Sequence, residues 1–212
     1  MLSDMALRAT FIGIDRHQDP RIKELTGARR DAIALFSLFA DTLPDLDGTL
    51  LVDRDASHGR VAEVIEQTLS AATPEDVVIL SFSGHGTRDH RIVVFDTNLD
   101  DLVGSTIAMS DLAQAFKRSR ARAILCILDC CFSGGASAKV IEETPVARDG
   151  VSLAELAGEG RILFAASNVN EPAYEMPGHR HGLLTKALID ELQAASDRID
   201  LLAANCEHSG AS

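Results

Sequence analysis

Two apolar runs in the sequence each end in a residue that could take part in nucleophilic catalysis. The first run leads into Ser-Gly-His-Gly at residues 83–86, which contains His85, and the second leads into residues 129–135, which contain Cys131. A thiolate attacks carbonyl carbons, and a neighbouring imidazole can take up the thiol proton and later protonate a leaving amine. If the two segments meet in the fold, they predict acyl transfer with Cys131 as the nucleophile and His85 as its partner.

Glycine residues flank both candidate side chains. Glycine lets a backbone approach a ligand closely and adopt conformations that other residues avoid. Backbone N–H groups exposed in such turns can stabilise the negative charge of a tetrahedral intermediate. The amides of Gly86 and Cys131 are therefore the candidate donors of an oxyanion hole.

The other cysteines and histidines have simpler interpretations. Cys126 lies in the middle of an apolar run and is expected to be inert core. No Cys-x-x-Cys pair occurs, which argues against a zinc site or a disulfide framework and favours a reducing, cytoplasmic compartment. A structural or solvated role is expected for His17, His58, His90 and His208.

The elements that must position the two segments alternate between strands and helices. Strands are expected at residues 6–14, 49–52, 76–83, 91–95, 121–128 and 161–166. Helices are expected at residues 32–43, 57–69, 109–116 and 183–192, with Ser57 as a candidate N-cap, and residues 135–158 are expected to be irregular. This alternation predicts an α/β fold with a mostly parallel sheet, and active sites of such sheets gather at the carboxyl ends of the strands.

Length and charge restrict the class of protein further. The chain has 212 residues, which suits one domain, expected over residues 1–198 and followed by a polar tail over residues 199–212 that could be a truncated end. The net charge of −12 argues against a nucleic-acid partner, because binding to phosphates needs clustered basic residues. No signal peptide and no run long enough to span a membrane is found, so no membrane partner is expected.

The segments SFSGHG (residues 81–86) and LDCCFSGG (residues 128–135) resemble the His and Cys boxes of the caspase-like cysteine peptidases of clan CD, and are most similar to metacaspases and their bacterial relatives. Their spacing also fits a caspase Cys whose His lies roughly 50 residues upstream. Further blocks that resemble the family are LTGARRDA (25–32), VVFDT (93–97), AASNVNEPAYE (165–175) and HGLLTKAL (181–188). The resemblance covers residues 6–195 and implies a caspase-like three-layer sandwich, with helices on both faces of the sheet, and a cysteine endopeptidase.

The resemblance also implies roles for particular residues. The metacaspase pattern Asp-x-Cys-x-Ser-Gly places the nucleophile at Cys131 and leaves Cys130 as the variable position. Phe132 stands where metacaspases often carry His, which would make the wall of the pocket more apolar.

Substrate selection after Arg or Lys is implied by an acidic pocket at Asp31, Ser83 and Asp129. Two carboxylates at the base of a pocket would pair with a basic side chain, and their geometry favours a guanidinium. Arg29 and Arg30 adjoin Asp31 in the sequence, so a preference for acidic residues stays open. The expected partner is thus a protein or peptide with a basic residue at the cleavage site.

Two further features follow from the same family. Many metacaspases need calcium, and Asp96, Asp100 and Asp101 form an acidic cluster after the His box, although the sequence shows no complete set of ligands. No other cofactor is expected. Family members often cut themselves after the nucleophile, and Lys139 and Arg148 are the candidate sites in this chain.

Other functions remain open at this point. A catalytically silent caspase-like domain could act as an interaction or regulatory module, but silent members usually lose the His and Cys that this chain retains. A phosphate- or nucleotide-binding α/β domain would need a glycine fingerprint that the sequence lacks. Bacterial domains of this kind are commonly controlled by a sensor or regulatory module, which is a possible partner.

Overall fold

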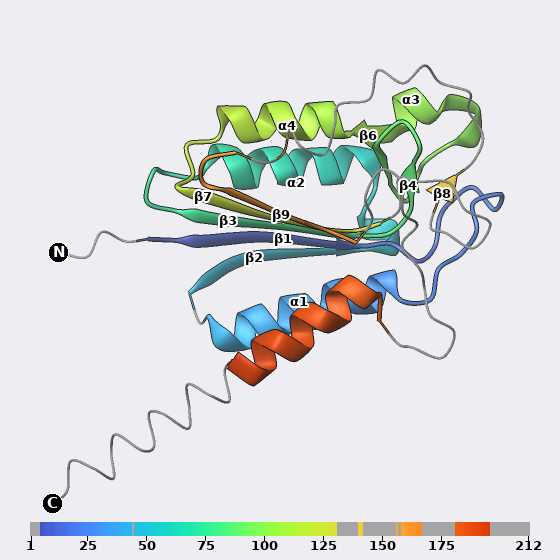
Figure 1. Ribbon diagram of the computed structural model, residues 1–212. Coiled ribbons are helices and arrows are strands. Elements are labelled where there is room, and N and C mark those ends of the chain that lie inside the picture. The colour runs from blue at the N-terminus through green and yellow to red at the C-terminus, as the bar shows by residue number, and fades with distance from the viewer. Residues whose placement is uncertain are drawn as a thin grey trace, which may run out of the picture.

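The computed structural model describes residues 5–43, 45–130, 140–141, 156, 158–166 and 181–195. Over these residues the chain forms a three-layer α/β fold, in which a central sheet lies between two layers of helices (Figure 1). The predicted boundary at residue 198 lies outside the described residues and stays a prediction.

The central sheet has five strands in the order β2-β1-β3-β7-β9, and every neighbouring pair is parallel. The strands are β1 (Leu7–Gly13), β2 (Leu46–Val52), β3 (Val77–Ser83), β7 (Ala123–Asp129) and β9 (Arg161–Ala165). Continuous apolar runs suit parallel strands that are covered on both faces, which explains why β3 and β7 were predictable as buried strands. The α/β class with a mostly parallel sheet is confirmed.

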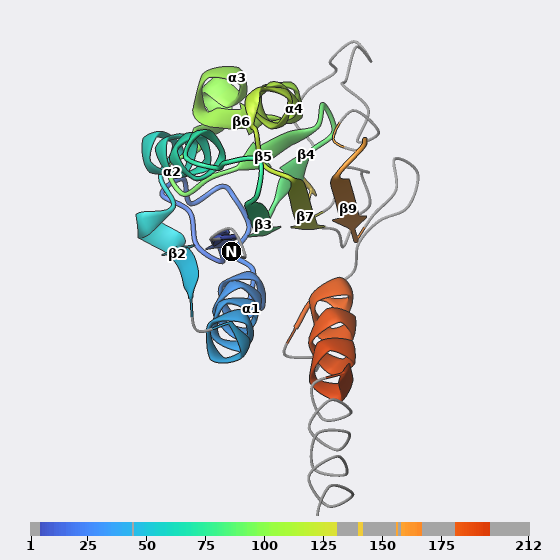
Figure 2. The same cartoon turned by 90° about the vertical axis from the view of Figure 1, so that its left-hand side faces the viewer.

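Four helices cover the two faces of the sheet. One face carries α1 (Ala28–Thr42) and the helix at residues 183–195, and the other carries α2 (His58–Ser70) and α4 (Met109–Arg118) (Figures 1 and 2). Each face has its own apolar core. Under α2 and α4 the core is mostly aliphatic, whereas under α1 the ring of Phe11 packs against Phe36 and Phe39 with ring centroids 5.8 and 5.6 Å apart.

A second, smaller sheet lies next to the carboxyl ends of the central strands. Its order is β6-β5-β4-β8, from β4 (Gly86–Thr87), β5 (Arg91–Val93), β6 (Thr106–Ala108) and β8 (Val140–Ile141). The short helices η1 (Asp53–Asp55), η2 (Leu99–Asp101) and α3 (Leu102–Ser105) complete the described elements. Of the strands of the smaller sheet and these short helices, only β5 was predicted from the sequence. Elements of two to four residues are too short to show a periodic pattern. The segment 135–158, expected to be irregular, contains β8.

Helix α1 packs directly on the end of β1 at Gly13. A Cβ atom at that position would lie 2.3 Å from the carbonyl oxygen of Ala28 and 2.7 Å from the Cβ of Ala32. Only a residue without a side chain allows this approach, so α1 can begin at Ala28, one turn earlier than predicted. As a consequence Asp31 lies in the first turn of α1, next to the carboxyl end of the sheet.

The N-terminus of α2 is capped differently from the prediction. Ser57 occupies the N-cap position with an extended backbone, but its side chain makes no capping hydrogen bond. The carboxylate of Asp96 instead accepts a hydrogen bond of 2.6 Å from the backbone N–H of His58. A side chain from a distant loop therefore satisfies one of the N–H groups that lack a partner within the helix at the start of α2.

Candidate active site

The two glycine-flanked segments begin at adjacent positions of the central sheet. Strands β3 and β7 pair in parallel with Ser83 opposite Asp129, and the N–H of Gly84 donates to the carbonyl of Asp129 across 3.4 Å. The strand that leads into His85 and the strand that leads into Cys131 therefore end side by side. Cys131 itself, together with Lys139 and Arg148, lies outside the described residues.

His85 is buried and held by a backbone carbonyl. Its side chain is 2% exposed, and its Nε2 lies 2.6 Å from the carbonyl oxygen of Lys23. A carbonyl oxygen only accepts hydrogen bonds, so Nε2 must carry a proton and the neutral ring keeps Nδ1 as its basic nitrogen. The backbone of His85 is fixed in turn, because its carbonyl accepts from the N–H of Val93 on β5. Sequence reasoning missed Lys23, because a backbone acceptor has no signature in residue types.

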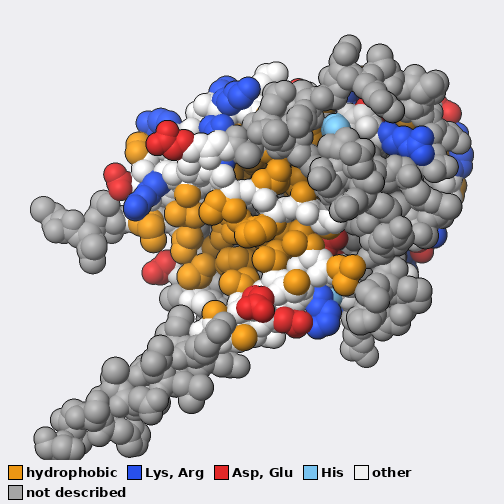
Figure 3. All heavy atoms as spheres, in the orientation of Figure 1, with side chains coloured by type: hydrophobic (Ala, Val, Ile, Leu, Met, Phe, Trp, Pro, Cys, Tyr) orange, Lys and Arg blue, Asp and Glu red, His pale blue; other side chains and the backbone are white. Residues whose placement is uncertain are grey.

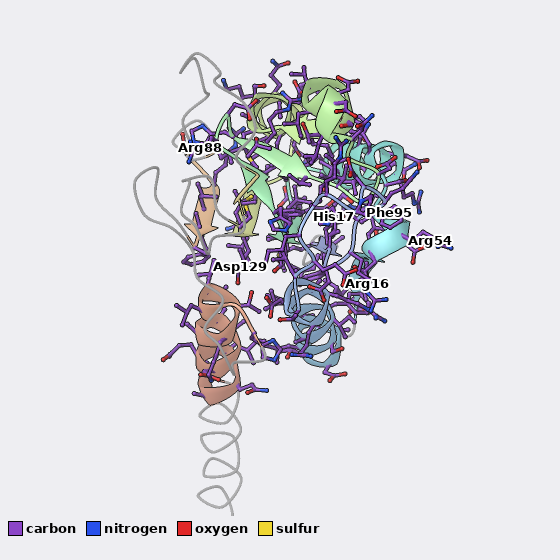
Figure 4. The ribbon with its side chains drawn as sticks, turned by 90° about the vertical axis from the view of Figure 1, so that its right-hand side faces the viewer. Arg16, His17, Arg54, Arg88, Phe95 and Asp129 are labelled. Carbon is purple, nitrogen blue, oxygen red and sulfur yellow. The ribbon has the colours of Figure 1, made fainter. Side chains whose placement is uncertain are left out.

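His17 is a second imidazole beside His85. The two rings lie 5.5 Å apart between centroids and are tilted by 43°. Both ring nitrogens of His17 are buried and have no hydrogen-bond partner among the residues that the structure describes. Burial, followed by the charge of His85, lowers the pKa of His17 from 6.5 to about 3. His17 is thus a neutral ring on the carboxyl-end face that also carries Asp129 (Figure 4), and not a solvated residue as one of the sequence alternatives had it.

Acidification is expected to destabilise the wild type more than a His17→Phe variant. The unfolded chain binds a proton at His17 near pH 6.5, whereas the folded chain binds one only near pH 3. Because the unfolded state binds more protons between these values, the free energy of unfolding falls as the pH falls through that window. Between about pH 7 and about pH 5 this residue should account for a loss of about 2 kcal/mol, which phenylalanine avoids. Denaturant unfolding of both proteins at the two pH values measures the difference, and equal losses would contradict a buried neutral His17.

The three residues predicted to form an acidic pocket lie together. Asp31, Ser83 and Asp129 are each at most 2% exposed, and the Ser83 hydroxyl donates to Asp31 Oδ2 across 3.1 Å. Asp31 comes from α1, whereas Ser83 and Asp129 end two neighbouring strands. The packing of α1 against β1 and the register of β3 with β7 therefore bring both carboxylates to one place.

Residues 181–185, at the start of the last described helix, bind both of these carboxylates. His181 Nδ1 lies 2.8 Å from Asp31 Oδ1, and the N–H of Gly182 donates to both oxygens of Asp31 at 3.3 and 3.1 Å. Thr185 donates to Asp129 Oδ2 with its backbone N–H at 3.2 Å and its hydroxyl at 2.7 Å. The block HGLLTKAL was noticed in the sequence, but no role followed for its residues, because their partners lie far away along the chain.

The described cysteines belong to the core. Cys126 and Cys130 are each 1% exposed and belong to the aliphatic cluster under α2 and α4. Burial raises the pKa of Cys126 to about 12, so its thiol stays protonated, as expected of an inert residue. The position of Cys130 inside the core leaves Cys131 as the candidate nucleophile at this end of β7.

The three carboxylates considered for calcium bind separate partners. Asp96 accepts from the N–H of His58, Asp100 pairs with the guanidinium of Arg21 at 3.0 Å, and Asp101 accepts from the N–H of Gly104 at 3.0 Å. Within the described ranges no three His, Cys, Asp or Glu side chains form a group that could hold a metal ion. The arrangement does not fit a calcium site, since a hard cation needs several oxygens directed at one point.

Comparison with protein families gives a match over nearly the whole chain. The model of the caspase domain matches residues 6–206. The chain belongs to the caspase domain family. The caspase domain places it in the clan of cysteine peptidases that includes caspases and metacaspases, whose substrates are proteins.

A solved structure supports the same fold. The crystal structure of a protein from Geobacter sulfurreducens is similar to this caspase domain with a TM-score of 0.68 and 16% sequence identity, over 90% of this chain and 83% of that one. No curated protein sequence matches the chain. Among the helices that the structure describes, none is both long and apolar enough to cross a membrane.

Proposed function

We propose that this caspase domain is a cysteine endopeptidase in which His85 and Cys131 form the catalytic dyad and which cleaves after Arg or Lys. The observation that carries the proposal is the orientation of His85. Its Nε2 is committed to the Lys23 carbonyl, at a strand end adjacent to the strand that leads into Cys131. A proton-accepting nitrogen is thus available where the sequence places a thiol.

The proposed reaction proceeds in two halves. His85 takes the thiol proton through Nδ1, and the sulfur of Cys131 attacks the carbonyl carbon of the peptide bond. The amides of Gly86 and Cys131 are the proposed donors to the oxyanion, and His85 returns the proton to the leaving amine. Water, deprotonated by His85, then attacks the thioester and releases the carboxyl product, which restores the thiol. Since the reaction needs a reduced thiol, we place the protein in the cytoplasm, and we expect a regulatory module to control it.

Specificity for basic residues is supported by the two buried carboxylates beside the dyad. A guanidinium can pair with carboxylates in a bidentate manner, and a buried pair is stronger than an exposed one. The arginines next to Asp31 do not favour the opposite preference. Arg30 is exposed, and Arg29, which is 56% exposed, pairs with Asp53 at 3.9 Å. Both side chains are therefore exposed, and the guanidinium of Arg29 is directed at Asp53.

Replacement of the proposed nucleophile tests the function directly. Fluorogenic peptides that end in Arg, Lys or Asp before the reporter are offered to the wild type, to Cys131→Ala and to Cys130→Ala. We expect the wild type to cleave the basic peptides, Cys131→Ala to lose at least about 1,000-fold in kcat, and Cys130→Ala to retain activity. Hydrolysis that survives in Cys131→Ala would overturn the dyad. If no peptide is cleaved by the wild type, the silent regulatory domain becomes the better interpretation.

Self-processing can be followed on the same proteins. Basic specificity makes Lys139 and Arg148, in the segment after the nucleophile, the proposed sites of autocleavage. Intact mass of purified wild type should reveal two fragments, and Cys131→Ala should remain whole. An uncut segment in a wild type that cleaves basic peptides would remove autocleavage from the proposal.

A further inference from the structure

Three donors of the described residues already bind the Asp31 carboxylate. His181 Nδ1 donates to Oδ1, Ser83 Oγ donates to Oδ2, and the single N–H of Gly182 is shared between both oxygens. An ionised carboxylate offers about four lone-pair sites, and a bidentate guanidinium needs two of them. A substrate arginine can therefore bind Asp31 in a bidentate manner only if a donor of the protein itself withdraws.

The donors differ in how easily they can leave. Ser83 is 2% exposed and lies in the centre of the sheet between β1 and β7. Gly182 is buried and tightly held, since a Cβ added there would lie 2.3 Å from Asp129 Oδ2. The side chain of His181 is 26% exposed, and rotation about its own bonds is enough to remove it from Asp31. Of these three donors, His181 is the one that can leave Asp31 and be solvated, whereas a withdrawn Ser83 hydroxyl would remain buried without its acceptor.

The imidazole also resembles the group that it would make way for. Like a guanidinium, it is planar and directs an N–H at the carboxylate, and in its protonated form it carries the same charge. We propose that His181 is a specificity-determining residue of the acidic pocket: its imidazole occupies, on Asp31, the place of a substrate guanidinium, and arginine binds by displacing it. This inference rests on the proposed function, because His181 would compete with the substrate guanidinium for Asp31 in the proposed pocket.

The proposal predicts opposite effects for two substitutions. His181→Ala removes the internal competitor, so KM for an arginyl peptide should fall by roughly tenfold, the value of one charge-assisted hydrogen bond, while kcat changes little. His181→Lys places a permanent ammonium at Asp31 and should raise KM by a similar factor. A purely structural role of His181 would instead make both variants worse, with lower kcat and no fall in KM.

The test combines kinetics with direct binding. Agmatine, which carries a guanidinium but no scissile bond, is titrated calorimetrically into wild type, His181→Ala, His181→Lys and the matched control Lys186→Ala, all in a Cys131→Ala background. Lys186 lies on the same helix and pairs with Asp190 at the surface, so its replacement should leave binding unchanged. The expected order of affinity is His181→Ala above wild type, and wild type above His181→Lys.

The outcomes separate this inference from the proposed function. If wild type cleaves arginyl peptides but all variants bind agmatine equally, the role of His181 is wrong and the peptidase stands. If arginyl peptides are not cleaved and agmatine does not bind any of the proteins, the basic pocket is wrong and the inference fails with it. Thermal unfolding confirms that each variant is folded. If His181→Ala does not fold, unchanged agmatine affinity in a folded His181→Lys overturns the inference.

Discussion

Replacement of His85 by alanine is expected to lower kcat on an arginyl peptide by at least about 1,000-fold, with little change in KM. In the proposed mechanism the imidazole takes the thiol proton and gives it to the leaving amine, and the side chain is only 2% exposed to solvent. The substitution also leaves the carbonyl of Lys23 without the donor at Nε2. Steady-state kinetics at neutral pH measures the loss.

A matched control for that variant is His58→Gln, at the start of α2. The structure uses the backbone N–H of His58, which the substitution retains, so activity should stay near that of the wild type. The pH profile adds a second criterion, because the acidic limb of kcat/KM should vanish from the residual activity of His85→Ala. Near-normal turnover in a folded His85→Ala protein would contradict the dyad.

Conversion of Asp31 to asparagine should lower kcat/KM for arginyl peptides by about 100- to 1,000-fold, since truncating one partner of a buried charge pair leaves the other without compensation. The effect should appear mainly in KM, because the proposed role of Asp31 is to bind the side chain next to the cleaved bond and not the bond itself. A loss of thermal stability is expected as well. The asparagine NH₂ would face the N–H groups of His181 and Gly182, which now donate to Asp31.

Asp47→Asn is the control for this second variant. Asp47 is a carboxylate that is 68% exposed on β2 and pairs with Arg8, so its loss should affect neither KM nor kcat. Competition between arginyl and neutral peptides separates a pocket from a general defect. If a folded Asp31→Asn protein keeps the wild-type preference for arginine, Asp31 does not determine the substrate specificity.

The sequence allowed the carboxyl end of the sheet to be recognised as the site because its signals are local. Long β-branched runs identify β3 and β7, and the glycines that follow them mark His85 and the segment of Cys131. Parallel pairing then follows from the alternation of strands and helices, without knowledge of any single contact. The resemblance to metacaspases implied that Ser83 and Asp129 lie together, and the register of β3 with β7 has them opposite each other.

What the sequence could not predict depends on contacts between distant segments. The carbonyl of Lys23 and the ring of His181 reach their partners across 62 and 150 residues. The carbonyl has no signature in residue types, and the block that contains His181 does not indicate which residue it binds. Proximity in sequence likewise does not predict the partners of the acidic cluster after the His box. Asp96 and Asp100 are close in sequence, yet Asp96 accepts from the N–H of His58 on α2 and Asp100 binds the guanidinium of Arg21.

The far edge of the sheet is also beyond local prediction. Strand β9 exposes Ile162 and Phe164, which are 55% and 41% accessible, and hydrophobic side chains gather on this face of the molecule (Figure 3). The sequence of β9 is apolar at four consecutive positions, 162–165, which is the pattern of a strand covered on both faces, so it does not predict that one face is exposed.

Asp129 ends β7 only two residues before Cys131, and its carboxylate is anchored by Thr185. The proposed specificity residue Asp129 and the proposed nucleophile Cys131 are thus separated by a single residue. A substitution of Asp129 that changes the substrate specificity should therefore also change the turnover rate, because it alters the backbone next to the proposed nucleophile. Asp31 lies on α1 and His181 lies just before the last described helix, so substitutions at these two positions could alter the substrate preference without acting on the backbone next to Cys131.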